Sequence, residues 1–389
     1  MRVLMVGHQY WPVAGSGSQV LGALTAQLRA KDVEVTVITS APGDGGPRRR
    51  TGPCGERVLC VGPAEGTANP VRRLFNLVLF AGRIVSSARA VDFDVVVSDP
   101  PPTAAFASLL VARRRRVPFV YYLADSWRAA AEGARQIWLR ALTPVIGAVE
   151  DYTLRHASTV LAATPGMARV AATAGAANSV TTIPNGIPTD VYTPDGERWW
   201  PSDKHNPFFV YAGNAGVVHG AEIFARAAEE RWRAGEVFDL VYLGYGSDSE
   251  LINDIASRWP DRVHCRGSVS AATVAAATRT AVASLASLRP STGYADARPI
   301  KAMSGLACGT PLIYAGSGDF ADLLAQADLA YVSPWDVSAV QENLGRALLD
   351  ATQADADERA RRVAFARENF DDRIPARIAT EAVLRPVSG

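Results

Sequence analysis

Residues 196–213 read GERWWPSDKHNPFFVYAG, and this stretch separates two halves of the sequence that repeat one pattern. Its first part, 196–207, is polar and rich in turn-forming residues, which is typical of a linker. Its last part, 208–213, is a short apolar run that ends in glycine and predicts a buried strand. Two domains are therefore expected, and the length of 389 residues agrees.

Short apolar runs alternate with helical stretches on both sides of this linker. Each run is continuously apolar, as in strands of a parallel sheet that is covered on both faces. The predicted strands are 2–7, 33–39, 57–62, 94–98, 118–124, 159–163 and 179–184, then 208–213, 238–244, 262–267, 281–287, 310–316 and 329–333. This alternation predicts an α/β protein with two doubly wound, Rossmann-like domains, whose ligands bind at the carboxyl ends of the strands.

The composition is that of a globular protein with a sizeable core, with 48% hydrophobic and 20% charged residues. A net charge of +1 gives no overall field that would attract nucleic acid. The cysteines lack metal-ligand spacing, so we expect reduced thiols and no metal site; they are Cys54, Cys60, Cys265 and Cys308. The sequence opens directly on a strand and has no membrane-length apolar run, which predicts a cytoplasmic location.

The first predicted domain carries possible ligand contacts where its strands end. Gly15, Ser16 and Gly17 precede a helix whose first N–H groups are open to a ligand. Aromatic side chains lie at the same predicted edge and either stack on a small ligand or pack in the core; they are Tyr10, Trp11, Tyr122 and Trp127. These residues form the predicted ligand site of this domain.

Two residues of this domain are candidates for orienting a nucleophile. Asp125 follows the strand 118–124, where a carboxylate can hold a hydroxyl or act as a base. It could equally cap the helix that follows. His8 follows the first strand and is the second candidate.

The second predicted domain repeats glycine turns that suit a diphosphate and a nucleoside. Lys301 opens a helix of small residues, and an ammonium group at a helix start attracts phosphate. The small residues of that helix alternatively serve close packing. The residues singled out in these turns are Gly213, Asn214, Gly216, His219, Gly244, Tyr245, Arg266 and Gly267.

Taken in order, these turns resemble the retaining nucleotide-sugar glycosyltransferases of GT-B fold, the glycosyl transferase group 1 or family-four class. The resemblance runs nearly end to end and rests on Gly15–Gly17, SDPPPTAAFASLL, ADSW, IPNGIP, YAGNAGVVHG, YLGYGS, RGSVS and RPIKAMSGLACGTPLI. The nearest branch carries a DLWP box, which here reads Asp125-Ser126-Trp127-Arg128.

The resemblance implies an acceptor domain of residues 1–195, joined by a C-terminal helix of about 366–389 that crosses back to it. It implies a donor domain of residues 196–365 that binds a UDP- or GDP-sugar as co-substrate, with no cofactor and no metal. Lys301 matches the family's phosphate lysine, and Asp296 matches the first acid of its Glu-x7-Glu pattern.

Three residues depart from the family pattern. Ser304 stands where the second acid belongs, and Asn214 and His219 stand where an Arg and a Lys normally contact the diphosphate. The resemblance then leaves Lys301, Arg298, a protonated His219 and the helix starts, with Arg289 as a further candidate, to stabilise the leaving group. We expect transfer with retention, in which a leaving phosphate oxygen takes the acceptor's proton and Asp125 or His8 orients the acceptor.

Alternative functions remain open at this stage. A small acceptor of natural-product or saccharide biosynthesis is the main hypothesis, and the oligomeric state is not indicated. Residues 69–90 combine arginines with apolar residues at helical spacing, which suits either a helix lying on a bilayer with a lipid-linked acceptor or one covering a sheet. The three departures also suit a catalytically weak auxiliary protein. A sugar-nucleotide epimerase lacks identifiable acid and base residues.

Overall fold

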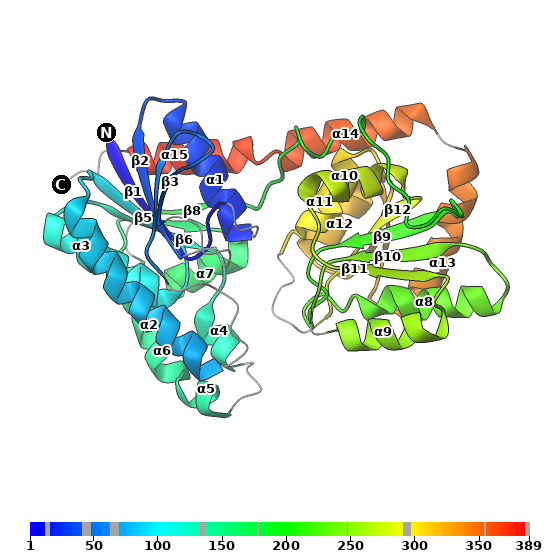
Figure 1. The fold of residues 1–389 in the computed structure, drawn as a ribbon, viewed down its shortest axis with the longest axis horizontal. Helices are drawn as coiled ribbons and strands as arrows, with labels where there is room; N and C mark the ends of the chain where they lie inside the picture. The colour runs from blue at the N-terminus through cyan, green and yellow to red at the C-terminus, as the bar shows by residue number, and fades with distance from the viewer. Residues whose placement is uncertain are drawn as a thin grey trace. The chain divides into compact units, whose positions relative to one another are not determined.

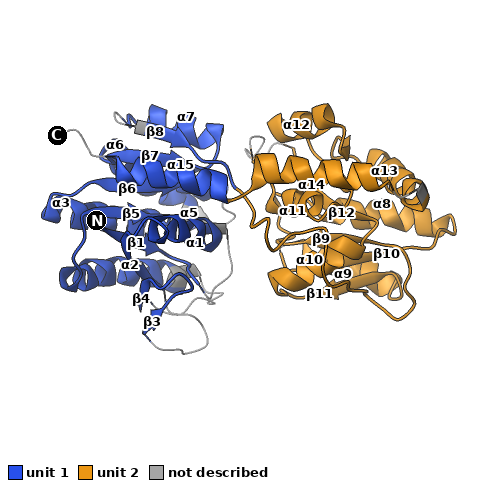
Figure 2. Ribbon diagram, turned by 90° about the horizontal axis from the view of Figure 1, so that it is seen from above, with its two compact units in different colours: residues 1–185, 373–389 blue, residues 186–372 orange. Residues whose placement is uncertain are grey.

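The computed structural model describes residues 1–11, 16–40, 48–62, 70–132, 137–176, 179–246, 248–290, 297–353 and 355–385. The chain forms two compact units, Met1–Asn185 with Arg373–Gly389 and Gly186–Asp372 (Figures 1 and 2). Each unit is built on its own parallel sheet with helices on both faces, so the predicted pair of Rossmann-like domains is confirmed.

Unit 1 has eight strands among its described residues, in the order β3-β4-β2-β1-β5-β6-β7-β8. They are β1 (Arg2–Gly7), β2 (Glu34–Thr39), β3 (Arg49–Thr51), β4 (Arg57–Cys60), β5 (Val95–Ser98), β6 (Phe119–Leu123), β7 (Thr159–Ala162) and β8 (Ser179–Thr182). Seven match the predicted apolar runs. The short β3 was not predicted because its sequence, RRT, is polar and lies at the sheet edge, where it pairs antiparallel with β4.

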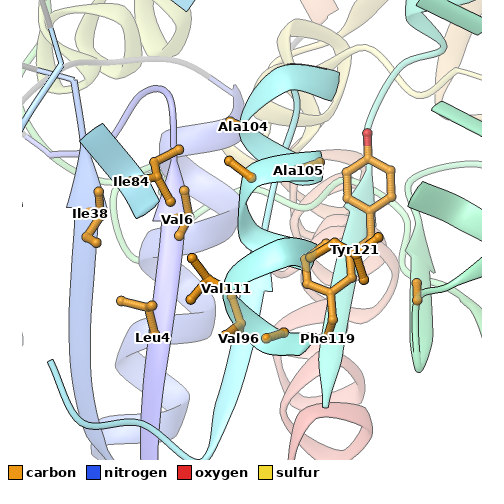
Figure 3. Close-up of a cluster of buried hydrophobic side chains, with 14 of the residues drawn as sticks. Leu4, Val6, Ile38, Ile84, Val96, Ala104, Ala105, Val111, Phe119 and Tyr121 are labelled. Atoms are coloured by element: carbon orange, nitrogen blue, oxygen red, sulfur yellow. The ribbon is translucent and has the colours of Figure 1, made fainter. Parts of the chain in front are cut away.

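The helices of unit 1 cover the sheet on two sides because the strand side chains alternate between its faces. They are α1 (Ser16–Arg29), α2 (Pro70–Ser87), α3 (Pro102–Arg115), α4 (Trp127–Glu132), α5 (Ile137–Ala141), α6 (Thr143–Arg155), α7 (Pro165–Thr173) and α15 (Arg373–Leu384). Leu4 and Val6 of β1 point to a cluster that includes Ile84 of α2 and Val111 of α3 (Figure 3). Val3 and Met5 point to the cluster under α1 and α15.

Unit 2 has six parallel strands among its described residues, in the order β11-β10-β9-β12-β13-β14. They are β9 (Phe208–Ala212), β10 (Asp239–Leu243), β11 (Val263–Arg266), β12 (Ala283–Ser287), β13 (Leu312–Ala315) and β14 (Ala330–Ser333). All six lie within the predicted runs. The helices are α8 (Glu222–Arg233), α9 (Ser249–Arg258), α10 (Ala271–Thr280), α11 (Ile300–Ala307), α12 (Asp319–Ala327), α13 (Val337–Asp350) and α14 (Ala356–Phe370).

The chain crosses between the units at residues 185–186 and again at 372–373. Within unit 2 the two crossing segments pair, because Ile187 N–H donates to Phe370 O at 2.8 Å and Asp372 N–H donates to Ile187 O at 3.0 Å. The C-terminal helix α15 packs on α1, so the predicted return of the chain to the first domain is confirmed.

The predicted linker at 196–207 lies inside unit 2. Trp199 and Trp200 pack on Phe208 of β9, and Arg279 of α10 donates to Thr193 O at 2.9 Å. The boundary at 195/196 between an acceptor domain and a donor domain is a proposal about function, and it differs from the boundaries of the two compact units. Among the described helices, none has both the length and the apolar character needed to span a bilayer.

Candidate functional site

The first turn of unit 1 closes around a buried carboxylate, Asp99, at the carboxyl end of β5. Its side chain accepts the His8 N–H at 3.2 Å. A Cβ added to Gly17 would stand 2.9 Å from Asp99 Oδ2, and one added to Gly7 would stand 2.5 Å from Leu21 Cδ1. A larger residue at either position would displace one of these side chains, so glycine lets β1, α1 and Asp99 approach one another as closely as they do. Sequence reasoning missed Asp99, although its position after a strand is the signal that singled out Asp125.

The predicted aromatic residues of this turn, Tyr10 and Trp11, differ in their exposure to solvent. Tyr10 is buried, its hydroxyl donates to Glu56 Oε1 at 2.7 Å, and burial raises the pKa of its hydroxyl. Trp11 is 43% exposed, so its indole is open to a ligand. Gly15 lies outside the described residues, and Ser16 is the first residue of α1. The burial of Tyr10 favours packing over acceptor contact.

Asp125 lies just beyond the end of β6, and its carboxylate accepts no hydrogen bond from the described N–H groups at the start of α4. Glu150 of α6 accepts the Trp127 N–H at 2.9 Å and the Ser126 hydroxyl at 3.1 Å, so it satisfies the start of α4 instead. Asp125 has no hydrogen bond or ion pair with the described residues. Asp125 is exposed on one side, and the protein packed on its other side reduces its hydration and so raises the pKa of the carboxyl.

Two tyrosines of β6 place their hydroxyls near this carboxylate. Tyr121 is fully buried, and its hydroxyl finds no hydrogen-bond partner in the described part of the chain. Figure 3 shows this oxygen pointing in the direction in which β1 runs from Leu4 to Val6, toward the carboxyl ends of the strands. The Tyr122 hydroxyl donates to Asn185 Oδ1 at 3.4 Å. Burial first, then the negative charges of Asp125 and other carboxylates, raises both tyrosine pKa values.

The predicted glycine turns of unit 2 form a tightly packed backbone surface. Gly213 and Gly244 have φ values of +132° and +137°, and a Cβ at Gly244 would clash with the carbonyl oxygen of Gly213. A Cβ at Gly246 would likewise clash with the backbone of Ala215, whose N–H donates to Tyr245 O at 3.0 Å. The loops after β9 and β10 can lie in contact only because glycine occupies these positions.

Two predicted residues flank this surface on the exposed side. Tyr245 is 69% exposed, and its hydroxyl lies against Gly267, where an added Cβ would displace the tyrosine ring. Arg266, the last residue of β11, is exposed at the edge of the sheet. Tyr245 and Gly267 are therefore brought together, while Arg266 lies on the outermost strand.

Lys301 is buried in the first turn of α11, beside the loop after β9. Its Nζ lies 4.8 Å from the centroid of the Tyr211 ring, and a Cβ at Gly213 would stand 3.1 Å from its Cε. Its ammonium group has no carboxylate partner among the described residues. Burial lowers the pKa of Lys301 to about 7, so the amine is close to half protonated at neutral pH, and its charged form has no counter-charge among the described residues.

The three departures from the family pattern lie around Lys301. Burial and the charge of Lys301 lower the pKa of His219 to about 4, and its Nδ1 is buried without a described hydrogen-bond partner. Asn214 is exposed, next to Gly213. The Ser304 hydroxyl is buried and donates to Lys301 O at 3.1 Å, which satisfies it within α11. At neutral pH His219 is therefore uncharged, which does not support the protonated His219 expected from the sequence, and Lys301 is the residue of this group that can carry a positive charge.

The remaining predicted cations differ in their surroundings. Arg289 forms an ion pair with Glu222, lies 3.7 Å from Asp248 Oδ2 and stacks over Trp335 at 5.0 Å. Burial and the negative Glu222 raise the pKa of Asp248 to about 6. Arg298 is half-buried, and desolvation lowers its pKa while Asp319 opposes the shift. Asp296 lies outside the described residues.

Metal-ligand clusters of three or more His, Cys, Asp or Glu residues do not occur in the described ranges. Among the described residues the four cysteines form no disulfide, and Cys60 and Cys308 are buried. The chemistry available is thus carboxylates and tyrosines at the strand ends of unit 1, and a buried lysine among glycine loops in unit 2.

Comparison with protein families identifies both halves of the chain. A family model described as "Glycosyl transferase 4-like domain" matches residues 15–186, and one described as "Glycosyl transferases group 1" matches residues 206–350. No curated protein matches the sequence.

Solved structures share the fold at low sequence identity. Sucrose-phosphate synthase from Thermosynechococcus elongatus is 16% identical, with a TM-score of 0.77 and 98% of each chain covered. HepE from Anabaena, in complex with UDP-glucose, is 16% identical, with a TM-score of 0.69 and 98% of this chain and 99% of that chain covered. The catalytic domain of starch synthase IV from Arabidopsis thaliana, bound to ADP and acarbose, is 13% identical, with a TM-score of 0.74 over 100% and 99%.

Proposed function

The chain belongs to the glycosyl transferases of group 1, the retaining GT4 family of GT-B fold, and from this premise we propose how it transfers a sugar. It is a nucleotide-sugar-dependent glycosyltransferase. The proposed donor is a UDP-sugar or GDP-sugar, and the proposed acceptor is a small molecule of natural-product or saccharide biosynthesis. Transfer proceeds with retention and without a metal ion. We also propose that the chain belongs to the branch of this family whose members carry a DLWP box, which lies here at residues 125–128.

The observation that carries the donor side is the position of Lys301. An ammonium group buried beside Gly213, over the Tyr211 ring and without a described carboxylate partner, costs free energy in the free protein. A diphosphate would supply the missing negative charge and would accept N–H groups from the loop after β9. We therefore assign the donor contacts to the residues predicted for the domain 196–365.

On the acceptor side, the domain 1–195 with the C-terminal helix supplies Asp125 and His8. Asp125 is the stronger candidate, because its carboxylate is not used as a helix cap and its pKa is raised. It would accept a hydrogen bond from the acceptor hydroxyl and orient it. The His8 ring packs edge-on to Phe80 at 5.5 Å, which fixes its plane at the same strand edge.

The proposed reaction breaks the bond between the sugar C1 and the diphosphate oxygen and forms a bond from C1 to the acceptor oxygen on the same face. The acceptor proton passes to an oxygen of the leaving diphosphate, so charge and protons balance. Lys301 and the loop N–H groups stabilise the negative charge that develops on the leaving group. No covalent sugar–enzyme intermediate is required.

HepE was solved with UDP-glucose and starch synthase IV with ADP, so nucleotide preference is the first property to test. Thermal unfolding with UDP, GDP, dTDP and ADP should show one nucleotide raising the Tm by a few degrees, because a ligand at 100 times its Kd adds about 2.7 kcal/mol. The shift should disappear in Lys301→Ala. No shift with any of the four would reject the donor site.

Two alternative functions have separate tests, and the first is tested by turnover. A catalytically weak auxiliary protein is favoured by the neutral His219 and by the Ser304 hydroxyl, which is already satisfied inside α11. Sugar transfer by the purified chain that continues in EDTA would exclude this alternative and support a metal-independent reaction. The second alternative, a lipid-linked acceptor, depends on a bilayer surface, and co-sedimentation with lipid vesicles tests it.

A further inference from the structure

A buried group of three charged side chains lies at the carboxyl edge of the unit 2 sheet. Glu222 is the first residue of α8, Asp248 immediately precedes α9, and Arg289 follows the end of β12 by two residues. Arg289 forms an ion pair with Glu222, and its guanidinium lies 3.7 Å from Asp248 Oδ2. Glu222 and Asp248 are 2% and 5% exposed, so both carboxyl groups are almost entirely removed from water. We call these three residues the ionic cluster.

The charges of the ionic cluster do not balance when both acids are ionised, because two carboxylates then face one guanidinium. Within the described part of the chain, Glu222 Oε2 and Asp248 Oδ2 are buried and receive no hydrogen bond. Burial first, and then a hydrogen bond with Glu222 and its charge, raise the pKa of Asp248 to about 6. A proton on Asp248 removes the excess charge and can be donated to Glu222, so that each acid gains a partner.

The other titratable groups that face the ionic cluster supply no counter-charge. Burial is the main cause of the raised pKa values of Tyr211 in β9 and Tyr242 in β10, and the charge of Glu222 adds to the shift in both. The Tyr211 hydroxyl donates to the backbone of the loop after β9 at 2.8 Å, and the Tyr242 hydroxyl donates to the residue before α8 at 3.1 Å. Glu250, on the first turn of α9, is exposed to solvent.

The ionic cluster joins the loops that carry the predicted donor residues. The backbone N–H of Arg289 donates to Val218 O at 2.9 Å, and the backbone N–H of Asp248 donates to Ala215 O at 2.9 Å. The guanidinium of Arg289 stacks over the Trp335 ring at 5.0 Å, and the Trp335 indole donates to a carbonyl of the same loop at 3.1 Å. The loop after β9 is therefore fixed from two sides by residues whose charges meet in the ionic cluster.

We propose that Glu222, Asp248 and Arg289 are positioning residues of the donor site, and that one proton shared by the two acids holds the loops after β9 and β10 in contact. Loss of this proton leaves two buried negative charges beside one cation, so the loops are held less firmly and the donor binds less tightly. Arg289 thus acts through the loops, and not by direct contact with the leaving group. This role rests on the proposed function, whereas the shared proton can be measured without any nucleotide.

The first test compares thermal unfolding of the wild type and Asp248→Asn against pH, without nucleotide. The pKa of Asp248 lies above its ordinary value of 3.8, so the folded chain binds more protons between about pH 4 and 6, and the stability contributed here falls as the pH rises through that range. The asparagine amide donates to Glu222 without carrying a charge. Asp248→Asn should therefore come close to the wild-type Tm at pH 4.5 and exceed it by a few degrees at pH 7.

An exposed acid of the same unit provides the matched control. Asp261→Asn removes a carboxylate whose side chain is 81% exposed, and its Tm should follow that of the wild type from pH 4.5 to 7. A Tm for Asp248→Asn below that of the wild type at pH 7 would show that Arg289 needs both negative charges, and it would overturn the shared proton. An equal gain in Asp261→Asn would assign the effect to net charge, with the same consequence.

The second test measures the affinity for UDP-glucose by calorimetry between pH 5 and 6.5. Lys301, with a pKa of about 7, stays mostly charged in this range, and the diphosphate diester loses no proton. The wild-type affinity should fall a few-fold, and Asp248→Asn should keep the higher affinity throughout. Wild-type affinity that does not change with pH would overturn the positioning role. If UDP-glucose binds at no pH while Asp248→Asn gains stability, the donor site and the positioning role fail and the shared proton stands.

The third test separates positioning by Arg289 from direct contact with the diphosphate. Arg289→Met should weaken UDP-glucose binding about tenfold or more, because it leaves two buried acids without their cation. Arg289→Met with Glu222→Gln removes one acid together with the cation and should recover most of the affinity. A direct contact predicts no recovery, so equal losses in the two variants would overturn the positioning role. If Arg289→Met does not fold, the double variant decides alone, since only positioning predicts near wild-type affinity for it.

Discussion

The carboxyl edges of the two parallel sheets are alike in backbone but differ in the candidate site residues that they carry. In unit 1 this edge carries the carboxylates Asp99 and Asp125 beside buried tyrosines, whereas in unit 2 it carries Lys301 beside glycine loops and a neutral His219. One topology therefore supports two kinds of ligand. A carboxylate edge suits the hydroxyl of an acceptor, and a cationic edge suits the diphosphate of a donor.

Removing the lysine tests the unit 2 half of this comparison and should have the largest effect. Lys301→Ala should lower kcat/KM for transfer by roughly one to three orders of magnitude, because the leaving diphosphate loses its buried cation. Steady-state kinetics with the donor varied would measure this. Lys204→Ala is the matched control, since Lys204 is exposed and paired with Asp261 at 3.5 Å. Wild-type kinetics in Lys301→Ala would remove the lysine from the site.

Neutralising the unit 1 carboxylate should have the next largest effect, and on a different parameter. Asp125→Asn should lower kcat about a hundredfold, because the acceptor is less well oriented, and should leave the nucleotide-induced thermal shift unchanged. Asp92→Asn, at an exposed carboxylate, should change neither. A loss of nucleotide binding in Asp125→Asn would contradict the division of roles between the two edges.

The fold was predictable because continuously apolar runs are a strong signal of buried parallel strands. The unpredicted β3 shows the limit of that signal, since an edge strand such as Arg49–Thr51 needs no apolar side chains. The return of α15 to unit 1 came from the family resemblance alone, because its packing on α1 joins residues far apart in the sequence.

The sequence predicted which loops form the candidate site, but it did not predict the burial or the hydrogen-bond partners of their side chains. Nothing in the sequence shows that Tyr10 donates to Glu56, or that Glu150 caps α4 and so leaves Asp125 unused as a cap. The same holds for the buried Tyr211 ring beside Lys301. Each of these pairs is made by residues from different elements, and only tertiary packing brings them together.

The glycine loops of unit 2 allow a test of whether the backbone contact between them is needed for nucleotide binding. Gly244→Ala should weaken nucleotide binding by about tenfold and lower the Tm, because the added Cβ clashes with Gly213 O at a φ of +137°. Gly235→Ala is the control, since Gly235 also has a positive φ, +91°, but a Cβ there meets no atom within 4 Å. Calorimetric titration with the preferred nucleotide would compare them. Equal affinity losses would show that the contact between the two loops is not needed.

The smallest expected effect is a pH dependence that belongs to unit 2 alone. The pKa of Lys301 is about 7 in the free protein, and a bound diphosphate should raise it, so donor binding takes up a proton above pH 7. The affinity for UDP-glucose should then fall several-fold between pH 7 and 8, and by no more than about tenfold per pH unit. UDP-glucose is the suitable probe because its diphosphate is a diester and loses no proton in this range.

Folding stability should respond to the same lysine with the opposite sign. Its folded pKa lies below the ordinary value of 10.5, so between about pH 7 and 10.5 the unfolded chain binds more protons and the stability contributed at this position rises with pH. Lys301→Met should remove both trends, and His219→Gln should remove neither, because His219, with a pKa of about 4, stays neutral throughout. Affinity that falls with pH in wild type and Lys301→Met alike would place the titrating group elsewhere. Donor affinity falling while ligand-free stability rises, with both trends lost in Lys301→Met, would identify one buried ammonium group as the cause of both.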